Sequence, residues 1–344
     1  MAERVTSIQV AERAGVSQSA VSRVYTPGAS VSSKTQEKVR KAATELGYRP
    51  NVLARAMVSG KSRMIGLVVA YLENYFYPEA VEKFSNALQE RGYHVLIFMA
   101  SQTASDIDGV MEEILDYQVD GIIMASAEMS SELSNRCQIS GIPAVLFNRS
   151  QDINGLSTIT SDNVAGGRQV AEFFHAGNHS RVSYIAGWEG ASTQRDREAG
   201  FLAGLAAANQ SLYSRGVGNF TIETAKQAAR EMFDCPKQKR PDAVFVANDH
   251  MAFAVMDVLR HELGLSVPDD VSVVGFDDVP PASWAAYNLT TVRQRANQMV
   301  EKTVSTLLNQ IENRRTPPQQ IIIDCPLIVR GSARIPEGWE NERL

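Results

Sequence analysis

Polar residues follow several short apolar runs in the part of the chain after residue 63. Asn148-Arg149, Asn248-Asp249 and Asp277-Asp278 each come directly after such a run, and Tyr71–Tyr77 and Gly187–Arg197 follow two others. Carboxylate, amide and guanidinium groups bind the hydroxyl or acid groups of small molecules, and aromatic rings cover their apolar faces. These segments therefore predict a polar binding cleft, provided that the fold brings them together.

A second set of polar side chains lies near the beginning of the chain. Gln18, Ser19, Ser22 and Arg23 point away from the apolar side of a short helical pattern. Amide, hydroxyl and guanidinium groups suit the base edges and phosphates of a DNA major groove. Gln18 is the best candidate for reading sequence, because a glutamine side chain can pair with two positions of adenine at once.

Patterns typical of enzymes and metal sites are absent from the sequence. His261-Glu262 lacks the second histidine of a zinc-protease helix, and no nucleophile elbow, phosphate-binding loop or dinucleotide-binding glycine pattern occurs. Asp277 and Asp278 are neighbours on an expected strand and would point to opposite faces. The five histidines and three cysteines show no ligand spacing, and the cysteines are expected to be free thiols. We therefore expect no enzyme, no metal site and no cofactor.

Three short helices are expected to position the first polar set. Thr6-Ser7 can cap a helix that ends at Gly15, Ser17 can cap a second helix over Gln18–Val24, and Ser32 or Ser33 can cap a third that ends at Gly47. Two short helices joined by a tight turn that contains glycine form the helix-turn-helix pattern. The alternative, a three-helix bundle without a role in DNA binding, is disfavoured by charge. Residues 1–63 hold eleven Lys/Arg and four Glu, a net +7, which leaves 23 basic and 35 acidic residues, a net −12, in the remainder.

The rest of the chain alternates apolar runs with helical patterns, which indicates an α/β fold with parallel sheets and helices on both faces. In such sheets, ligands bind beyond the carboxyl ends of the strands. Gly166-Gly167 has no phosphate-binding partner residues and is expected to permit close packing of helices. The expected strands are 65–70, 94–100, 121–126, 143–148, 181–187, 242–248 and 271–278, and helical patterns include 78–90, 165–176, 196–209 and 251–263.

Composition limits the class and the location of the protein. Hydrophobic residues make up 44% and charged residues 21% of the 344 residues, which is typical of a globular protein. No apolar run approaches the roughly 20 residues that span a bilayer, and the first residues lack the apolar segment of a signal peptide. We therefore expect a cytoplasmic protein.

The first region resembles the head of the lactose/galactose repressor family of bacterial transcription regulators. The motifs are VAERAGVSQSAVSRV (Val10–Val24) and VSSKTQEKVRKAATELGYRPN (Val31–Asn51). The resemblance implies a helix-turn-helix domain over residues 1–49 and a hinge helix and linker over 50–63, which orders on operator DNA; the alternative is a plain interdomain linker helix. Met57 stands where the family has a leucine that wedges into the minor groove. The implied DNA-binding residues are Ser17, Gln18, Ser19, Ser22, Arg23, Asn51, Ala54, Arg55 and Met57.

The remainder resembles the family's two-lobed, periplasmic-binding-protein-like core over residues 64–340. The motifs are SDNVAGG (Ser161–Gly167), RDREAGF (Arg195–Phe201), VANDHMA (Val246–Ala252), VPDDVSVVGFDD (Val267–Asp278) and LTTVRQ (Leu289–Gln294). One lobe is expected to hold about 64–160 and 292–322, the other about 161–290 and 323–340, with crossings near 158–163, 289–294 and 321–326. The implied effector contacts are Tyr75, Phe76, Asn148, Arg149, Ser192, Arg197, Phe220, Asn248, Asp277 and Gln294.

Each of several implied contacts has a structural alternative. Arg197 and Asp277 could form a salt bridge across the cleft, Phe220 could belong to the core, and Tyr75 and Phe76 could cover the mouth of the cleft.

The resemblance implies a homodimeric repressor that binds a pseudo-palindromic operator and is controlled by a small metabolite. Arg149, Arg195 and Arg197 favour a sugar acid, whereas Asp249 and Asp277 favour the hydroxyls of a sugar, so we expect one of these two classes. We expect the ligand to relieve repression; co-repression, which also occurs in this family, is the alternative that the sequence leaves open. A solute-binding protein of a transporter or a sugar-modifying enzyme are the competing classes. The first is disfavoured by the basic head, and the second lacks a catalytic constellation.

Overall fold

The computed structural model describes residues 5–26, 28–49, 61–100, 109–110, 113–125, 131–151 and 156–339. The chain divides into two compact units, Met1–Arg63 and Met64–Leu344. They are called the head and the core below, and each is described by itself.

The head contains α1 (Ser7–Ala14), α2 (Gln18–Val24) and α3 (Ser33–Leu46). The caps predicted from the sequence are confirmed. The hydroxyls of Thr6, Ser17 and Ser32 accept backbone N–H groups of the first turns. Gly15 and Gly47 end α1 and α3 in the left-handed conformation that glycine adopts without strain. A small apolar core joins the three helices through Val10, Ala11, Val21, Val24, Val39, Ala42 and Ala43.

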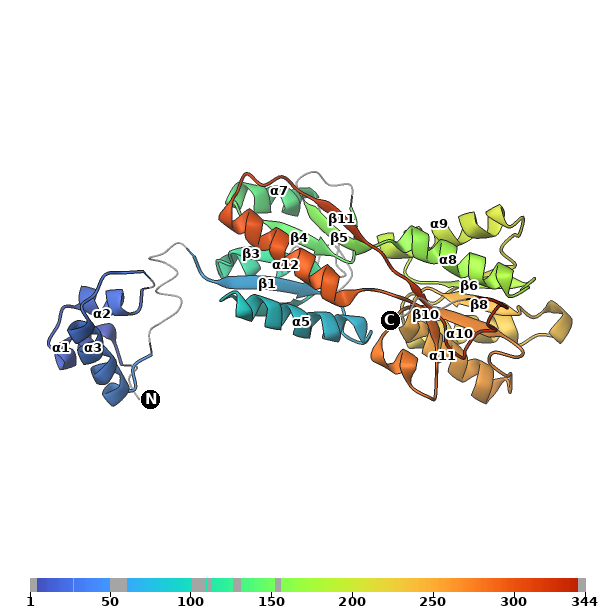
Figure 1. Cartoon of the computed structure of the whole chain (residues 1–344), viewed down its shortest axis with the longest axis horizontal. Helices are drawn as coiled ribbons and strands as arrows, with labels where there is room; N and C mark the ends of the chain where they lie inside the picture. Colours follow the sequence, from blue (N-terminus) through green and yellow to red (C-terminus); the bar gives the residue numbers. More distant parts are fainter. Residues whose placement is uncertain are drawn as a thin grey trace. The chain divides into compact units, whose positions relative to one another are not determined.

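The core is built on two six-stranded sheets (Figure 1). The first has the order β11-β5-β4-β3-β1-β2 and the second has the order β12-β10-β9-β8-β6-β7; every pair is parallel except β10 with β12. The first sheet consists of β1 (Met64–Val69), β2 (His94–Met99), β3 (Gly121–Ala125), β4 (Ala144–Phe147), β5 (Ser157–Ser161) and β11 (Gln320–Ile323). The second consists of β6 (Val182–Ala186), β7 (Ser214–Val217), β8 (Ala243–Val246), β9 (Ser272–Asp277), β10 (Thr290–Arg293) and β12 (Leu327–Ile328).

Helices cover both sheets, as the α/β pattern predicted, and complete two lobes, as the resemblance implied. The first lobe is the first sheet with α5 (Phe76–Glu90), α7 (Ser131–Ser140) and α12 (Ala296–Glu312). The second lobe is the second sheet with α8 (Asn163–Ala176), α9 (Ser192–Ala207), α10 (Ile222–Phe233) and α11 (Asp249–Asp257). Central strands such as β1 and β3 are buried throughout, which explains their continuous apolar sequence.

The chain passes between the lobes at three places. It leaves β5 for α8 at residues 161–163, returns from β10 to α12 at 293–296, and leaves β11 for β12 at 323–327. The carboxyl ends of parallel strands in each lobe therefore face the region where the chain crosses (Figure 1).

The differences from the sequence expectation include β7 and the helix around residues 251–263. β7 was not predicted, because Ser214 and Arg215 break any apolar run in this edge strand, which is only half buried. The helix expected over 251–263 begins earlier and is regular only to Asp257, after which residues Val258–Glu262 form a π-helical turn.

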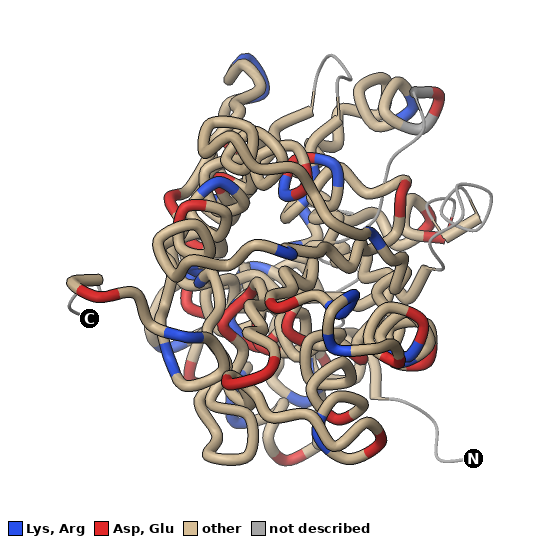
Figure 2. Tube along the Cα trace, turned by 90° about the vertical axis from the view of Figure 1, so that its right-hand side faces the viewer, with Lys and Arg blue, Asp and Glu red and all other residues tan. Residues whose placement is uncertain are grey.

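Charged residues of both signs are interspersed along the trace in Figure 2. Ion pairs at the surface of the core illustrate this mixing, such as Arg91 with Glu301 and Arg230 with Glu262. No helix within the described parts of the chain is long and apolar enough to cross a membrane.

Candidate DNA-binding face and ligand site between the lobes

The candidate DNA-binding residues of the head form one exposed face of α2. Ser17, Gln18, Ser19, Ser22 and Arg23 are all exposed, whereas Val21 and Val24 on the opposite side are buried. The Gln18 side chain donates to Ser7 Oγ at 3.0 Å, and the hydroxyls of Ser17 and Ser19 lie 2.9 Å apart. None of these side chains is buried in the apolar interior of the head, so all of them remain candidates for contact with DNA. Four further candidates, Asn51, Ala54, Arg55 and Met57, lie outside the described residues.

A cavity of about 430 Å³ lies between the two lobes of the core. Phe76 and Glu79 of α5 belong to the first lobe, and Asp277 belongs to the second. The cavity therefore has walls from both lobes and from a crossing segment. Its lining residues are Phe76, Glu79, Asp277, Asp278, Val279, Pro280, Arg293, Gln294, Arg295, Ala296, Asn297 and Gln298.

The Asp277 carboxylate has polar partners from both lobes. Register between β9 and β10 places Asp277 beside Arg293, so that the next residue, Gln294, donates to Asp277 Oδ1 at 2.7 Å. Asn74 of the first lobe donates to Asp277 Oδ2 at 3.1 Å. Burial raises the pKa of Asp277, and the nearby Arg197 guanidinium opposes that rise. Asp278, by contrast, pairs with Arg293 at 2.6 Å, so the two aspartates have separate partners as expected.

Arg197 is held within the second lobe on several sides. It donates to Asn163 Oδ1 at 2.9 Å and to the Ala247 carbonyl at 2.6 Å, and its guanidinium carbon lies 3.7 Å from the centre of the Phe276 ring. Its Nη2 is 3.6 Å from Asp277 Oδ1. The pair suggested as an alternative therefore exists, but it lies inside the second lobe and not across the cleft, because α9 and β9 belong to the same lobe.

Asn148 and Arg149 approach the second lobe from the end of β4. Arg149 Nη1 donates to Thr193 Oγ1 at 2.8 Å, and the Ser150 N–H donates to Ser192 Oγ at 2.9 Å. Asn148 Nδ2 donates to the Tyr77 hydroxyl at 3.3 Å, and Asn148 Oδ1 is buried with no hydrogen-bond partner among the described residues. This oxygen is therefore a candidate acceptor for a ligand group.

Among the described residues, Asn248 of the second lobe has a buried donor without a partner, as Asn148 has a buried acceptor without one. Its Oδ1 caps α11 by accepting from the Met251 N–H at 3.0 Å, which leaves Nδ2 buried without a partner within the described parts of the chain. Because an unsatisfied buried polar atom is costly, such atoms at strand ends are candidates for ligand contacts.

Three aromatic candidates are placed differently from one another. Tyr75 is 48% exposed, while Phe76 is 2% exposed and stacks on Phe147 with ring centres 5.9 Å apart. Phe220 is 5% exposed and its ring contacts Gly187 closely enough that a Cβ there would overlap it. The structure thus places Phe220 in the apolar core, in agreement with the alternative noted for it.

Two residues used in the argument on ligand class do not line the cavity between the lobes. Arg195 has 65% of its side chain exposed and pairs with Asp196 at 2.8 Å. Asp249 is fully buried, where it accepts from Thr291 Oγ1 at 2.6 Å and from the Val279 N–H at 3.1 Å, and burial raises its pKa to about 8. The sequence reasoning placed both residues at the cleft from their position after a strand. That position does not determine the direction in which a side chain points, so the placement failed for both.

Sequence reasoning also missed three residues that the structure brings to the site. Asn74, Asn163 and Thr193 each bond to a candidate residue. All three lie within or beside motifs that were noted, but nothing in the sequence identified their partners.

Comparison with known proteins extends these observations over the whole chain. Residues 8–51 match the model of bacterial regulatory proteins of the lacI family, and residues 171–333 match the periplasmic binding protein-like domain. The transcriptional regulator CelR of Thermobifida fusca is 31% identical over 96% of this chain and 98% of its own length. The chain belongs to the lacI family.

Other relatives of this lacI-family regulator agree with that assignment. The transcriptional repressor PurR of Vibrio campbellii is 29% identical over 94% of this chain and 97% of its own length. Among solved structures, a Lac repressor dimer bound to operator and the anti-inducer ONPF has a TM-score of 0.86, with 26% identity over 96% of this chain and 99% of that one. A CelR–cellobiose complex has a TM-score of 0.72, with 30% identity over 96% of this chain and 100% of that one. The family and fold expected from the sequence are confirmed, as is the function of transcription regulator.

Proposed function

We propose that this regulator is a homodimeric repressor that binds a pseudo-palindromic operator through α2, and that a sugar or sugar acid bound between its lobes relieves repression. The observation that carries the ligand part is the meeting of polar groups from both lobes around Asp277. Similarity to the CelR–cellobiose complex supports a sugar, and similarity to the operator-bound Lac repressor supports operator binding.

This proposal assigns one set of residues to DNA binding and another to ligand binding. Ser17, Gln18, Ser19, Ser22 and Arg23 contact the major groove, and residues 50–63 form the hinge, with Asn51, Ala54, Arg55 and Met57 on DNA. Residues 1–49 form the DNA-binding domain and residues 64–340 form the ligand-binding and dimerising core. The polar ligand contacts come from Asn148, Arg149, Ser192, Arg197, Asn248, Asp277 and Gln294, with Tyr75 and Phe76 at the first-lobe wall and Phe220 supporting from the core.

The ligand acts through its different affinity for two arrangements of the lobes. Of the three arginines considered as ligand contacts, Arg149 and Arg197 are buried at the facing ends of the lobes, whereas Arg195 is exposed and is left out. Their main partners are other protein groups, and this favours a hydroxyl-rich ligand over a strongly acidic one. The protein acts on operator DNA in the cytoplasm and turns over no substrate.

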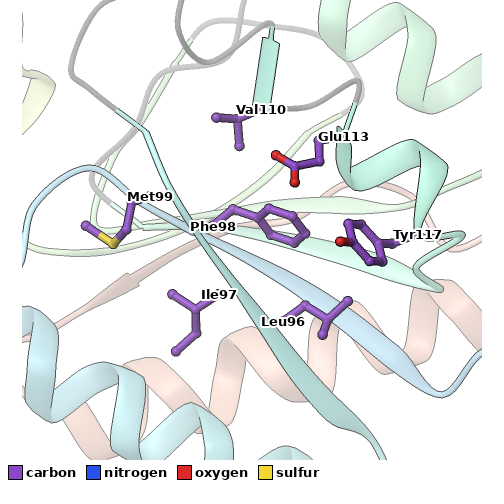
Figure 3. A pocket seen from close by; sticks show the side chains of 7 residues that line it. All are labelled: Leu96, Ile97, Phe98, Met99, Val110, Glu113 and Tyr117. Carbon is purple, nitrogen blue, oxygen red and sulfur yellow. The ribbon is translucent and has the colours of Figure 1, made fainter. Parts of the chain in front are cut away.

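The outer edge of the first sheet supports dimer formation. β2 is an edge strand on which Ile97 and Met99 are each 51% exposed, and Tyr117 beside it is 46% exposed. Figure 3 shows Phe98 and Tyr117 on one side of this strand and Ile97 on the other, around a groove of about 360 Å³. Exposed apolar side chains on an unpaired edge are costly in a monomer, so we assign this edge to contact with a second copy.

Thermal unfolding of the full-length protein against sugars and sugar acids tests the ligand. A ligand at 100 times its dissociation constant stabilises the folded protein by about 2.7 kcal/mol, which raises the melting temperature measurably. The ligand found is then added to an operator-binding titration, where weaker binding supports relief of repression. If no sugar or sugar acid shifts the melting temperature, the ligand proposal fails, while operator binding is judged by the titration alone.

A further inference from the structure

Asn74 connects the two lobes of the core through its side-chain amide. It lies in the loop between β1 and α5 of the first lobe and is 3% exposed. Its Nδ2 donates to Asp277 Oδ2 at 3.1 Å, across 203 residues of sequence. Its Oδ1 accepts from the Phe76 N–H at 3.0 Å, at the first turn of α5. The amide is therefore fixed on the first lobe at one end and bonded to the second lobe at the other.

Hydrogen bonds continue from Asp277 to two of the crossings between the lobes. Gln294 donates to Asp277 Oδ1 at 2.7 Å, and Ser161 Oγ donates to Gln294 Oε1 at 2.8 Å. Ser161 ends β5 and Gln294 follows β10, so each stands where the chain changes lobe. Every member of this chain of bonds is buried, where hydrogen bonds are electrostatically stronger than in water.

A second, separate contact between the lobes lies at the end of β4. The Ser150 N–H donates to Ser192 Oγ at 2.9 Å, and Arg149 donates to Thr193 Oγ1 at 2.8 Å. Neither contact involves Asn74, so the Ser150 amide reports on the separation of the lobes independently.

We propose that Asn74 is a latch that holds the lobes together through Asp277, and that a ligand group binding this carboxylate replaces the Asn74 amide. The latch sets the balance between the two lobe arrangements before ligand acts, and the ligand shifts that balance by exchanging one hydrogen bond for another. The inference rests on the proposed ligand site, but its test needs no ligand.

Replacement of Asn74 by aspartate distinguishes a role in holding the lobes together from a role confined to the start of α5. Asn74→Asp keeps an oxygen that accepts from the Phe76 N–H but sets a carboxylate against Asp277. Like charges at this distance repel, so the lobes should separate. Asn74→Ser is the milder variant, because its hydroxyl still caps α5 but no longer reaches Asp277.

Hydrogen exchange and small-angle scattering on the full-length protein without added ligand measure the outcome. We expect the Ser150 amide to exchange about fivefold faster or more in both variants, the lower end of usual coupling between sites. The radius of gyration should rise as well, while amides of β6 inside the second lobe keep their rates. If Ser150 exchanges at the same rate in Asn74→Ser as in the unaltered protein, Asn74 only caps α5 and the latch is disproved. Ligand binding by the unaltered protein is measured separately, so either proposal can fail alone.

Discussion

Two buried carboxyl groups in the second lobe show how neighbouring acids take different roles. Asp277 faces the cavity and accepts from groups of both lobes, whereas Asp249 accepts from Thr291 and from the Val279 N–H inside the lobe. Burial is the main cause of the raised pKa of both carboxyl groups, and the charge of Asp277 raises the pKa of Asp249 further. Asp249 is therefore expected to carry its proton at neutral pH, while Arg197 favours charge on Asp277.

The raised pKa of Asp249 predicts that stability depends on pH. Its carboxyl has a pKa of about 8 in the folded protein, against about 3.9 in an unfolded chain. The folded state therefore holds the proton more tightly, and the stability from this group is full below about pH 4 and lost as pH rises toward 8. Melting temperatures measured between pH 5 and 8 should fall more steeply for the unaltered protein than for Asp249→Asn. Parallel curves would contradict the assignment.

At the DNA-binding face, Gln18 is expected to read one base pair. Gln18→Ala should weaken operator binding by about 1–3 kcal/mol and reduce discrimination at a single position, because a two-point contact with adenine is lost. Binding is measured by fluorescence anisotropy against operators changed one base pair at a time. The matched control is Gln36→Ala on α3. If both variants lose affinity equally for all sequences, Gln18 does not read a base.

Among the elements, α8 and α9 approach each other most closely because glycines line their contact. A Cβ on Gly167 would overlap the Arg197 carbonyl oxygen, and a Cβ on Gly200 would overlap the Val164 carbonyl oxygen. This confirms for Gly167 the expectation that Gly166-Gly167 permits close helix packing, whereas Gly166 lies against Phe276 of β9 and Cys325. The contact matters for the site, since α9 carries Arg197 and α8 begins with its partner Asn163.

Gly167→Ala should therefore destabilise the core although alanine favours helix. The change to alanine stabilises the helix itself by about 1 kcal/mol. Overlap of the new Cβ with backbone atoms of Arg197 and Phe201, however, forces α8 and α9 apart. Such overpacking typically costs roughly 1–3 kcal/mol, and more where the backbone cannot move. Urea unfolding measures the net loss of unfolding free energy. Because the variant also disturbs the hydrogen bond from Arg197 to Asn163, ligand binding should weaken in parallel. Glu172→Ala, at an exposed position of α8, serves as control. Equal stability of the two variants would show that the helices adjust freely.

At the scale of the whole molecule, the three crossings allow a rearrangement in one lobe of the core to affect the other lobe. Asp278 pairs with Arg293 and Arg330 at 2.6 Å each, and Arg293 stands at the start of the crossing from β10 to α12, so this crossing is tied to the second lobe. Packed interfaces of this kind shift between discrete arrangements instead of deforming continuously. A dimer through β2 would couple those arrangements in two subunits.

Ile97→Asp tests that assembly. A carboxylate on the exposed edge of β2 would be buried in the proposed dimer, where an unpaired charge costs several kcal/mol. Light scattering after size-exclusion chromatography should show the mass of a monomer for this variant and of a dimer for the unaltered protein. Ile139→Asp is the control, because Ile139 is a still more exposed isoleucine, at 78%, on α7. A dimeric Ile97→Asp protein would place the interface elsewhere.

Local patterns in the sequence determined most of the elements. Caps at Thr6, Ser17 and Ser32 depend on neighbours within a few residues, so the three helices of the head were predicted with their ends. Continuous apolar runs marked the seven expected strands, including the half-exposed edge strand β2, whereas Ser214 and Arg215 interrupt β7 and β12 is too short to form such a run. The strands β5, β10 and β11 lie at the crossings that the resemblance implied. The order of strands and helices also predicted the α/β class and the edge at which polar residues gather.

Only the tertiary structure decided which of those polar residues meet and in what direction they point. Asn74 and Asp277 are 203 residues apart, and no spacing in the sequence links them. Arg195 and Arg197 are separated by one residue of the same helix, yet one side chain is at the surface and the other is buried against Phe276. The physical reason is that hydrogen-bonded caps and apolar periodicity are local, whereas burial and partner choice depend on how distant segments pack together.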